Sequence, residues 1–305
     1  MSNFSNKFSA FFQIIRWKNV SITLATLWLV FIFLPAQVHE CAPDFTLYFM
    51  LFTLAFACVV GAGNIHNDML DVEGDAANKK ERLVIPSLIS ARGAKHFFIA
   101  LYALGFVSIS IVAVRFEAWD FIVFYLTVMF VIMTYNSHLK CVPFVGNAVV
   151  AFLCAAVIVA PLFFKCVDHL PISVNSTDVF GIIFAFSIFS FLINLLREIV
   201  KDLQDMKGDV KVGCHTLPVT YGVINTRRII SVITLLFMIG LLFWTVGVAR
   251  MQGAFFAVMI FLIITVPLGF CIMKLYDENY STAQKLLKMV LLIGLFVFIV
   301  LNIVI

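Results

Sequence analysis

Apolar runs, each about as long as a lipid bilayer is thick, dominate this chain of 305 residues. A helix of roughly twenty residues, rising about 1.5 Å per residue, crosses about 30 Å of hydrocarbon. Only 12% of the residues are charged and 63% are hydrophobic, a balance that does not suit the surface of a soluble domain. We therefore predict an all-α, polytopic bundle of nine transmembrane helices. The expected spans cover residues 20–38, 45–66, 95–114, 119–136, 143–163, 178–197, 228–249, 253–273 and 284–304.

The basic residues indicate the orientation of these spans. With the N-terminus in the cytoplasm, every lysine and arginine except Arg115, Lys165 and Arg250 falls on the cytoplasmic side. Cytoplasmic loops of membrane proteins carry an excess of basic residues, so this topology is favoured. It predicts an integral multi-pass protein of the cell inner membrane with its C-terminus outside. No linker rich in Pro, Gly or Ser divides the chain, and we expect one membrane domain over residues 1–305.

The N-terminal segment, residues 1–18, has two interpretations. Phe4, Phe8 and Phe11 follow a helical spacing, and a Trp between two basic residues comes after them at Trp17. The segment could be the beginning of the first spanning helix. It could also be an amphipathic helix that lies in the membrane interface, with Trp17 as an anchor. We favour the interfacial helix.

Two acidic stretches with the same spacing follow two of the apolar runs. Their aspartates are Asp68, Asp71 and Asp75 in the first stretch and Asp202, Asp205 and Asp209 in the second. An even number of spans separates the stretches, so both are expected on the cytoplasmic side. We expect them in cytoplasmic cap loops at residues 67–94 and 198–227, with Gly74 and Gly208 ending or loosening the helices.

The spacing of these aspartates places three carboxylates on a narrow arc of a helix. Like charges on one face repel, and a bare carboxylate near lipid is costly, so bound cations would explain the arrangement. Oxygen ligands suit Mg²⁺. We therefore predict that all six aspartates bind Mg²⁺ and, through it, a diphosphate. For one stretch alone, a solvated helix end with ordinary ion pairs is an equal alternative, but the repeated spacing disfavours it.

Other polar residues near the acidic stretches are expected to contact the diphosphate, because Lys and Arg neutralise phosphate oxygens. The expected diphosphate-binding residues are Asn67, Lys79, Arg82, Lys140, Arg197 and Lys211. We expect the catalytic residues to be Asp68, Asp71, Asp202, Asp205, Tyr135 and Lys201. Tyr135 could offer its ring to a developing cation or its hydroxyl to phosphate; the alternative is an interfacial aromatic anchor.

The cysteines show no C-x-x-C pairing, and most of the seven lie inside or beside apolar runs. Reduced, packed thiols are therefore expected. A disulfide between Cys41 and Cys166, both on the outer face, stays open as an alternative.

Together these residues indicate departure of a diphosphate from a lipidic substrate, stabilised by metal and basic groups. The small net charge of +4 says little about nucleic acid, and because the basic residues lie beside the acidic stretches and form no separate run, no nucleic-acid partner is expected. The CDP-alcohol phosphotransferases also use membrane aspartates, but their Asp-Gly-x-x-Ala-Arg segment is absent here. A cation transporter would place its acids near mid-membrane on broken helices rather than at helix ends.

At these residues the chain resembles the UbiA-type family of intramembrane prenyltransferases. The resemblance covers the nine expected spans, the Asn-Asp-x-x-Asp-x-x-x-Asp motif at residues 67–75 and the Asp-x-x-Asp-x-x-x-Asp motif at residues 202–209. Residues 78–82 resemble the family's N-K-P-x-R-P segment, although Lys80 and Leu83 replace its two prolines. The resemblance implies two aspartate motifs that bind Mg²⁺-diphosphate, cytoplasmic caps over a central cavity and a polyprenyl diphosphate donor.

Within that family, residues 197–218 and 135–147 are similar to the geranylgeranylglycerol-phosphate geranylgeranyltransferase (digeranylgeranylglyceryl phosphate synthase) branch. This similarity implies transfer of a prenyl group to the glycerol hydroxyl of a prenylglycerol phosphate, a step of ether-lipid synthesis. The surplus basic residues Lys140 and Lys201 would suit an acceptor that carries its own phosphate. The alternative is a lipophilic aromatic acceptor, such as 4-hydroxybenzoate or a naphthoate in quinone biosynthesis.

Overall fold

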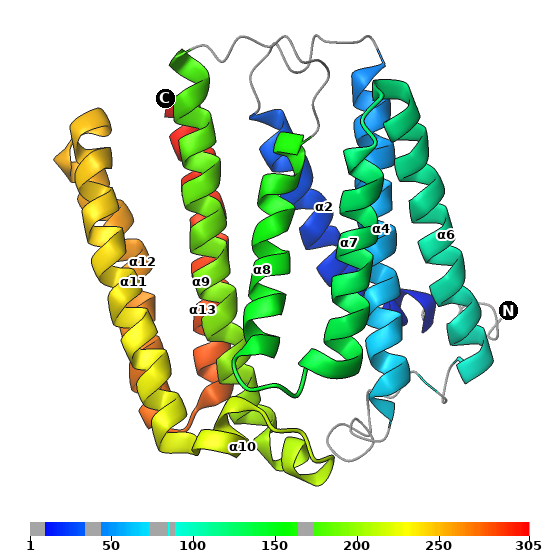
Figure 1. Ribbon diagram of the computed structural model, residues 1–305. Helices are drawn as coiled ribbons and strands as arrows, with labels where there is room; N and C mark the ends of the chain where they lie inside the picture. Colours follow the sequence, from blue (N-terminus) through cyan, green and yellow to red (C-terminus); the bar gives the residue numbers. More distant parts are fainter. Residues whose placement is uncertain (1–9, 34–43, 73–84, 86–88, 164–173, 305) are drawn as a thin grey trace, which may run out of the picture. The chain divides into compact units, whose positions relative to one another are not determined.

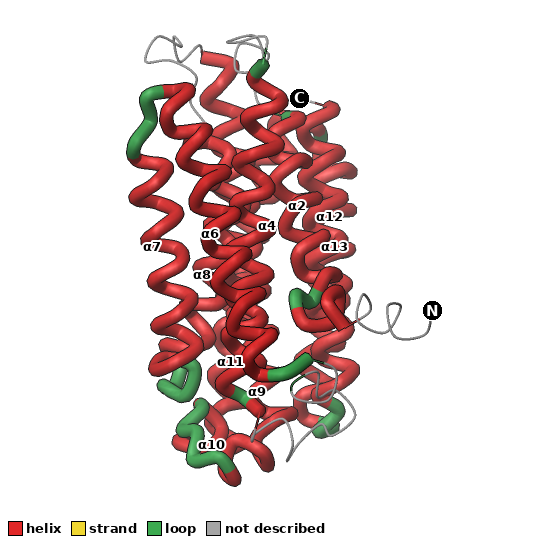
Figure 2. The backbone as a smooth tube through the Cα atoms, turned by 90° about the vertical axis from the view of Figure 1, so that its right-hand side faces the viewer, coloured by secondary structure: helices red, strands yellow, loops and turns green. Residues whose placement is uncertain are grey.

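The computed structural model describes residues 10–33, 44–72, 85, 89–163 and 174–304. Within these residues the chain is helical and contains no strand (Figure 2). The α-helices are α2 (Trp17–Ile32), α4 (Phe45–Leu70), α6 (Ala91–Phe116), α7 (Asp120–Thr134), α8 (Val145–Val159), α9 (Val174–Lys211), α10 (Leu217–Tyr221), α11 (Val223–Gln252), α12 (Ala254–Tyr276) and α13 (Tyr280–Val304). A π-helix, η2 (Tyr135–Leu139), continues α7, and a 3₁₀ helix, η3 (Ala160–Phe163), continues α8.

Eight helices of the described part are long and apolar enough to cross a membrane, which confirms an all-α, multi-pass membrane protein. The first expected span, 20–38, corresponds to α2, which has 16 residues; residues 34–43 lie outside the described part. The count of nine spans and the cytoplasmic N-terminus therefore stay predictions. The placement of residues 1–18 in the membrane interface also stays a prediction, since residues 1–9 are not described.

The helices that carry the acidic stretches extend beyond the apolar runs. Helix α4 continues four residues past the expected end at 66, and α9 runs unbroken through Gly208 to Lys211. The expectation that Gly208 would end or loosen its helix is therefore wrong. Hydropathy falls where the acids begin, but the backbone can keep its helical hydrogen bonds, because a single helical glycine costs only about 1 kcal/mol relative to alanine.

The helices form two compact units, residues 1–140 with 156–183 and residues 141–155 with 184–305. In the first unit, α4 packs against α2, α6 and α7 (Figure 1). Small residues allow the close approach of these helices: a Cβ on Gly63 would lie 2.6 Å from the side chain of Ile132. The hydroxyl of buried Tyr125 donates to the carbonyl of Tyr102 at 3.1 Å, which joins α7 to α6.

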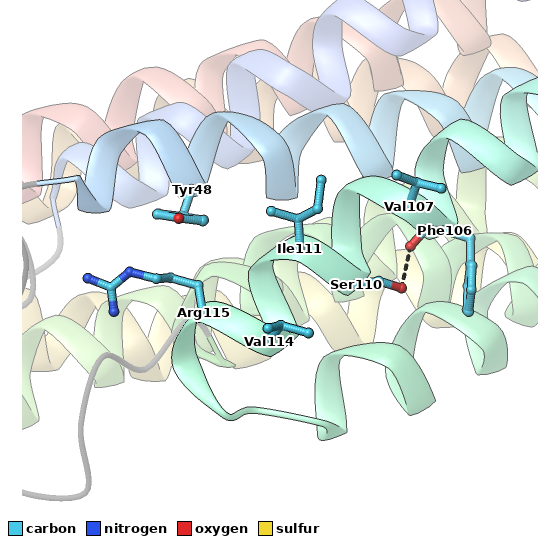
Figure 3. Close-up of a pocket in the computed structure, with 7 residues that line it drawn as sticks. All are labelled: Tyr48, Phe106, Val107, Ser110, Ile111, Val114 and Arg115. Atoms are coloured by element: carbon cyan, nitrogen blue, oxygen red, sulfur yellow. Dashed lines mark hydrogen bonds between the residues drawn. The ribbon is translucent and has the colours of Figure 1, made fainter.

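The outer surface of the first unit has a groove of about 550 Å³, lined mostly by apolar side chains of α6 (Figure 3). Its end near the start of α4 holds Arg115, which donates to both carboxylate oxygens of Asp44 at 3.2 and 3.1 Å. These hydrogen bonds hold the pKa of Asp44 below its usual range. The groove thus lies at the opposite end of α4 from the acidic stretch.

In the second unit, one face of α9 is buried in an apolar core shared with α11, α12 and α13. Ile193, Leu196, Ile199, Val200 and Leu203 are between 0 and 5% exposed. This burial holds the helix that carries the second acidic stretch by its apolar face, while Asp202, Asp205 and Asp209 lie at half-buried positions.

Candidate functional site

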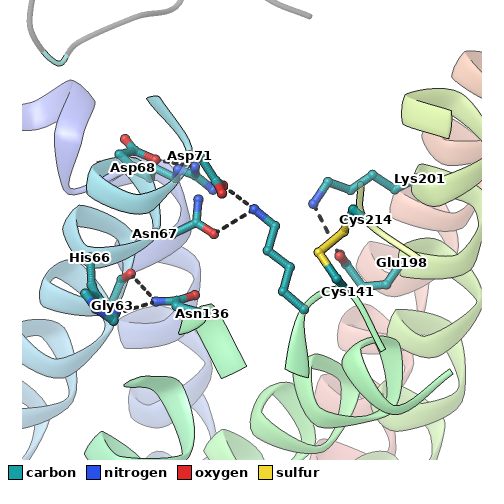
Figure 4. Close-up of polar contacts among 12 residues, drawn as sticks. Gly63, His66, Asn67, Asp68, Asp71, Asn136, Cys141, Glu198, Lys201 and Cys214 are labelled. Carbon is teal, nitrogen blue, oxygen red and sulfur yellow. Dashed lines mark hydrogen bonds and ion pairs between the residues drawn. A yellow bond between two sulfur atoms is a disulfide. The ribbon is translucent and has the colours of Figure 1, made fainter. Parts of the chain in front are cut away.

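The first acidic stretch begins on the last turn of α4. Asn67 and Asp68 lie on the helix, and Asp71 follows its last residue, donating its backbone N–H to the carbonyl of Asn67 at 3.0 Å. In Figure 4 the side chains of Asn67 and Asp71 are directed to the same side of the helix end. Asp75, Lys79 and Arg82 lie outside the described residues, so their expected roles stay predictions.

Lys140 connects this stretch to the end of α7. Its ammonium group forms an ion pair with Asp71 and lies 3.4 Å from the Oδ1 atom of Asn67 (Figure 4). Lys140 follows the π-helix η2 and donates its backbone N–H to the carbonyl of Tyr135 at 2.9 Å. Tyr135, half-buried, is the first residue of η2. Two expected diphosphate ligands, Asn67 and Lys140, are therefore in contact with each other.

The π-helix is fixed to α4 by Asn136, whose amide donates to the carbonyl of Gly63 at 2.9 Å and lies 3.3 Å from Nδ1 of His66. A π-turn re-aims the residues that follow it, and such turns are frequent at functional sites. Here the residue that follows is Lys140. This local geometry gives His66 a structural partner on η2.

The carboxylate of Asp68 accepts a hydrogen bond at 2.6 Å from the guanidinium of Arg16, which precedes α2. The side chain of Asp68 is 16% exposed and that of Arg16 41% exposed. Arg16 was not among the residues expected at the site. Asn64, which shares an arc with Asp68 and Asp71, donates its amide to the carbonyl of Ile15 at 2.9 Å and so holds the same segment.

The second acidic stretch lies wholly on the continuous helix α9. The carboxylate of Asp202 accepts a hydrogen bond at 2.7 Å from the amide of Asn147, near the start of α8. The carboxylate of Asp209 accepts one at 3.0 Å from the hydroxyl of Thr216, and Asp205 is half-buried on the same helix. The structure therefore anchors the first and last aspartates of this stretch to other segments of their unit.

The basic residues around the second stretch lie close to Glu198. The Lys201 ammonium is 3.4 Å and the Arg197 guanidinium 3.9 Å from its carboxylate, and Arg197 also donates to the Oδ1 atom of Asn194 at 3.3 Å. Glu198 is only 12% exposed. Lys211 is the last residue of α9 and is exposed. Glu198 thus orients two expected site residues, Arg197 and Lys201.

A disulfide joins Cys141, next to Lys140, to Cys214, which follows the second acidic stretch (Figure 4). Their Cα atoms are 4.8 Å apart, and the two residues are 73 positions apart in sequence. The expectation of reduced thiols is wrong for this pair; Cys58, Cys154 and Cys271 are free, and Cys41 and Cys166 lie outside the described residues. Sequence spacing could not pair residues so far apart, although both follow expected cytoplasmic helix ends.

The oxygen atoms of both stretches fit Mg²⁺ chemically, since this ion prefers carboxylates and is usually held by one or two of them with waters and phosphate. Two carboxylates of the first stretch, Asp68 and Asp71, already attract a cationic side chain each. No group of three His, Cys, Asp or Glu side chains within the described ranges converges enough to hold a metal alone. The chemistry of the carboxylates thus fits Mg²⁺ as a partial ligand set in each stretch.

Comparison with known proteins gives the family of this fold and sequence. The model of the UbiA prenyltransferase family matches residues 18–298. A digeranylgeranylglyceryl phosphate synthase from Pyrococcus horikoshii is 31% identical over 185 residues, 60% of this chain and 60% of that protein. The chain thus spans about three fifths of the length of the first such relatives.

Two solved structures share the fold. One, from a study of digeranylgeranylglyceryl phosphate synthase in membranes, has a TM-score of 0.66 and 23% identity, covering 97% of this chain and 99% of the other. The second is a UbiA homologue from Archaeoglobus fulgidus bound to DMAPP and Mg²⁺, with a TM-score of 0.57 and 15% identity, covering 92% of this chain and 98% of the other. At these identities they establish the helical architecture of the chain.

Proposed function

The chain belongs to the UbiA prenyltransferase family, and we propose that it transfers a prenyl group from a polyprenyl diphosphate to the glycerol hydroxyl of geranylgeranylglycerol phosphate. The observation that carries this proposal is the set of contacts around the first stretch. There an amide oxygen and two carboxylates, those of Asn67, Asp68 and Asp71, lie among the cationic groups of Arg16 and Lys140. Such a mixture of oxygen ligands and cations suits a metal-bound diphosphate.

In the proposed reaction, the bond between the allylic carbon of the donor and its diphosphate oxygen breaks. The hydroxyl oxygen of the acceptor forms the new ether bond to that carbon, and its proton leaves with the diphosphate or passes to a carboxylate of the second stretch. When bound, Mg²⁺ would neutralise charge on the diphosphate as it departs. The residues of this chain position the two substrates and neutralise the remaining phosphate oxygens.

We assign the metal ligands as Asp68, Asp71, Asp75, Asp202, Asp205 and Asp209. We assign the diphosphate contacts as Asn67, Lys79, Arg82, Lys140, Arg197 and Lys211. Lys201, held by Glu198, is 46% exposed, which suits a contact with the phosphate of the acceptor. Tyr135 is proposed to face the developing allylic cation with its ring or the phosphate with its hydroxyl.

The proposed site faces the cytoplasm, with cap segments at residues 67–94 and 198–227 above a membrane domain that covers the whole chain. The distribution of lysine and arginine supports this orientation. The orientation is tested by labelling single cysteines, introduced next to Lys211 or next to Asp44, in sealed inner-membrane vesicles. Labelling of the Lys211 position from the cytoplasmic side alone is expected.

The acceptor is tested with the purified full chain, Mg²⁺ and geranylgeranyl diphosphate. Separate reactions receive geranylgeranylglycerol phosphate, 4-hydroxybenzoate or a naphthoate, and products are identified by mass spectrometry. The expected result is a diether product that requires Mg²⁺ and forms only with the glycerol acceptor. Turnover of the aromatic acids alone would overturn the ether-lipid assignment and retain prenyl transfer.

A further inference from the structure

The N-terminal segment that precedes α2 is firmly attached to the helix of the first acidic stretch. Ile14 is completely buried in an apolar cluster with Ile65, Ile85 and Ala94. The amide of Asn64 donates to the carbonyl of Ile15 at 2.9 Å, which fixes the backbone one residue further on. The position of Arg16 over the end of α4 is therefore determined by the contacts of the two residues that precede it.

The backbone of Arg16 is in the left-handed region, with φ 52° and ψ 58°. This conformation is unfavourable for a residue with a side chain, and glycine would adopt it more easily. The ion pair with Asp68 gives little in return, because exposed pairs contribute little to stability and the Arg16 side chain is 41% exposed. Stability alone therefore does not explain an arginine at this position, and strained residues are frequent at functional sites.

A divalent cation and the Arg16 guanidinium compete for the same oxygen atoms. Asp68 Oδ1 lies 2.6 Å from the guanidinium, which is the distance of a direct charge-assisted hydrogen bond. A planar guanidinium can instead pair with two oxygens of a phosphate group. Arg16 can thus neutralise the carboxylate of Asp68 before the metal binds and the diphosphate after the metal has bound.

We infer that Arg16 is a further site residue, which occupies Asp68 in the free protein and turns to the donor diphosphate when a divalent cation takes its place. This inference rests on the proposed function. By this inference the N-terminal segment lines the diphosphate site and is not a membrane anchor alone. In the same way, Lys140 pairs with Asp71 in the free protein and turns to the diphosphate when a cation binds.

Binding of Mn²⁺ and of inorganic pyrophosphate to the purified full chain in detergent tests the inference without catalysis. Free Mn²⁺ is measured by electron paramagnetic resonance, and pyrophosphate by calorimetry at saturating Mn²⁺. Arg16→Gln is expected to bind Mn²⁺ alone about 3–10-fold more tightly, because its competitor is lost. It is expected to bind pyrophosphate about 10-fold or more weakly, because a charge-assisted hydrogen bond is lost.

Two variants serve as controls. Arg115→Gln removes another arginine–aspartate pair of the same unit, at the far end of α4, and is expected to change neither affinity. Arg16→Lys keeps the charge but loses the planar fork, and is expected to recover part of the pyrophosphate affinity, which also provides a folded variant if Arg16→Gln does not fold.

Opposite changes in the two affinities support the inference, because a merely structural residue would weaken both or neither. Unchanged affinities in Arg16→Gln, with normal binding by the wild type, would overturn the role of Arg16 alone. Failure of the wild type to bind Mn²⁺ and pyrophosphate would overturn the proposed metal site together with it. The two failures are therefore distinguishable.

Discussion

The amide of Asn147 donates to the carboxylate of Asp202 at 2.7 Å, so the start of α8 positions the first aspartate of the second acidic stretch. Asn147 itself is only 7% exposed. Asp202 therefore approaches its proposed metal with one carboxylate oxygen already oriented by a buried amide. Such supporting hydrogen bonds around metal ligands commonly affect affinity and activity by about 10–100-fold.

Replacement of this amide tests its positioning role. We expect Asn147→Ala to lower kcat/KM for geranylgeranyl diphosphate by about 10-fold or more, because a hydrogen bond to a charged group contributes about 1.5–3 kcal/mol. The Mg²⁺ concentration at half-maximal rate is expected to rise as well. Asn225→Ala is the matched control, since exposed Asn225 only donates to the carbonyl of Tyr221. Wild-type Mg²⁺ dependence in Asn147→Ala would contradict the assignment.

Lys140 is expected to contribute to donor binding through its charge. Lys140→Met keeps the length of the side chain and removes the ammonium that contacts Asn67 and Asp71. We expect the KM for geranylgeranyl diphosphate to rise about 10-fold or more, while the half-exposed ion pair costs less than about 1 kcal/mol of stability.

Steady-state kinetics together with thermal unfolding in detergent separate these two effects. Lys288→Met removes an exposed lysine of α13 and should leave KM unchanged. A large loss of thermal stability in Lys140→Met without any change in KM would assign Lys140 to the fold rather than to the substrate.

The disulfide between Cys141 and Cys214 closes a long loop, because it links two residues of the second unit that are 73 positions apart in sequence. A disulfide that closes a long loop typically raises the free energy of unfolding by about 2–4 kcal/mol. We expect the double variant Cys141→Ser, Cys214→Ser to unfold at a lower temperature than the wild type. Dithiothreitol is expected to lower the unfolding temperature of the wild type and to leave that of the variant unchanged. Alkylation of both cysteines in the unreduced, purified protein would contradict the pairing.

Much of the helical architecture is predictable from the apolar runs, because spans such as α11 and α12 are determined by hydropathy and length alone. The ends of α4 and α9 are different. Their last turns carry Asp68 and Asp209, and hydropathy does not register a helix that continues into polar residues. Both acids accept a hydrogen bond from another segment, Asp68 from Arg16 and Asp209 from Thr216, which helps the helices to continue there.

The spacing marked the acidic stretches, and Lys140 was expected at the site from its place at a helix end, but three other partners of the aspartates were not predicted. Asn67, Asp68 and Asp71 form one stretch, and the spacing alone marks them. Arg16, Asn147 and Thr216 contact aspartates of their own unit from 7 to 55 residues away. A weak indication existed for Arg16 and Asn147, because the expected topology placed both at cytoplasmic helix ends, level with the acidic stretches.

The central claim is that the two acidic stretches act together in one Mg²⁺-dependent prenyl transfer, so that neither suffices alone. The most direct measurement is product formation from geranylgeranyl diphosphate and geranylgeranylglycerol phosphate by Asp68→Asn and by Asp202→Asn, with Asp277→Asn, an exposed partner of Lys274, as the control. The rate of each of the two site variants is expected to fall about 10²–10³-fold or more, while its unfolding temperature stays that of the wild type. The control is expected to keep the wild-type rate. Near wild-type turnover by either site variant at saturating Mg²⁺ would contradict the account.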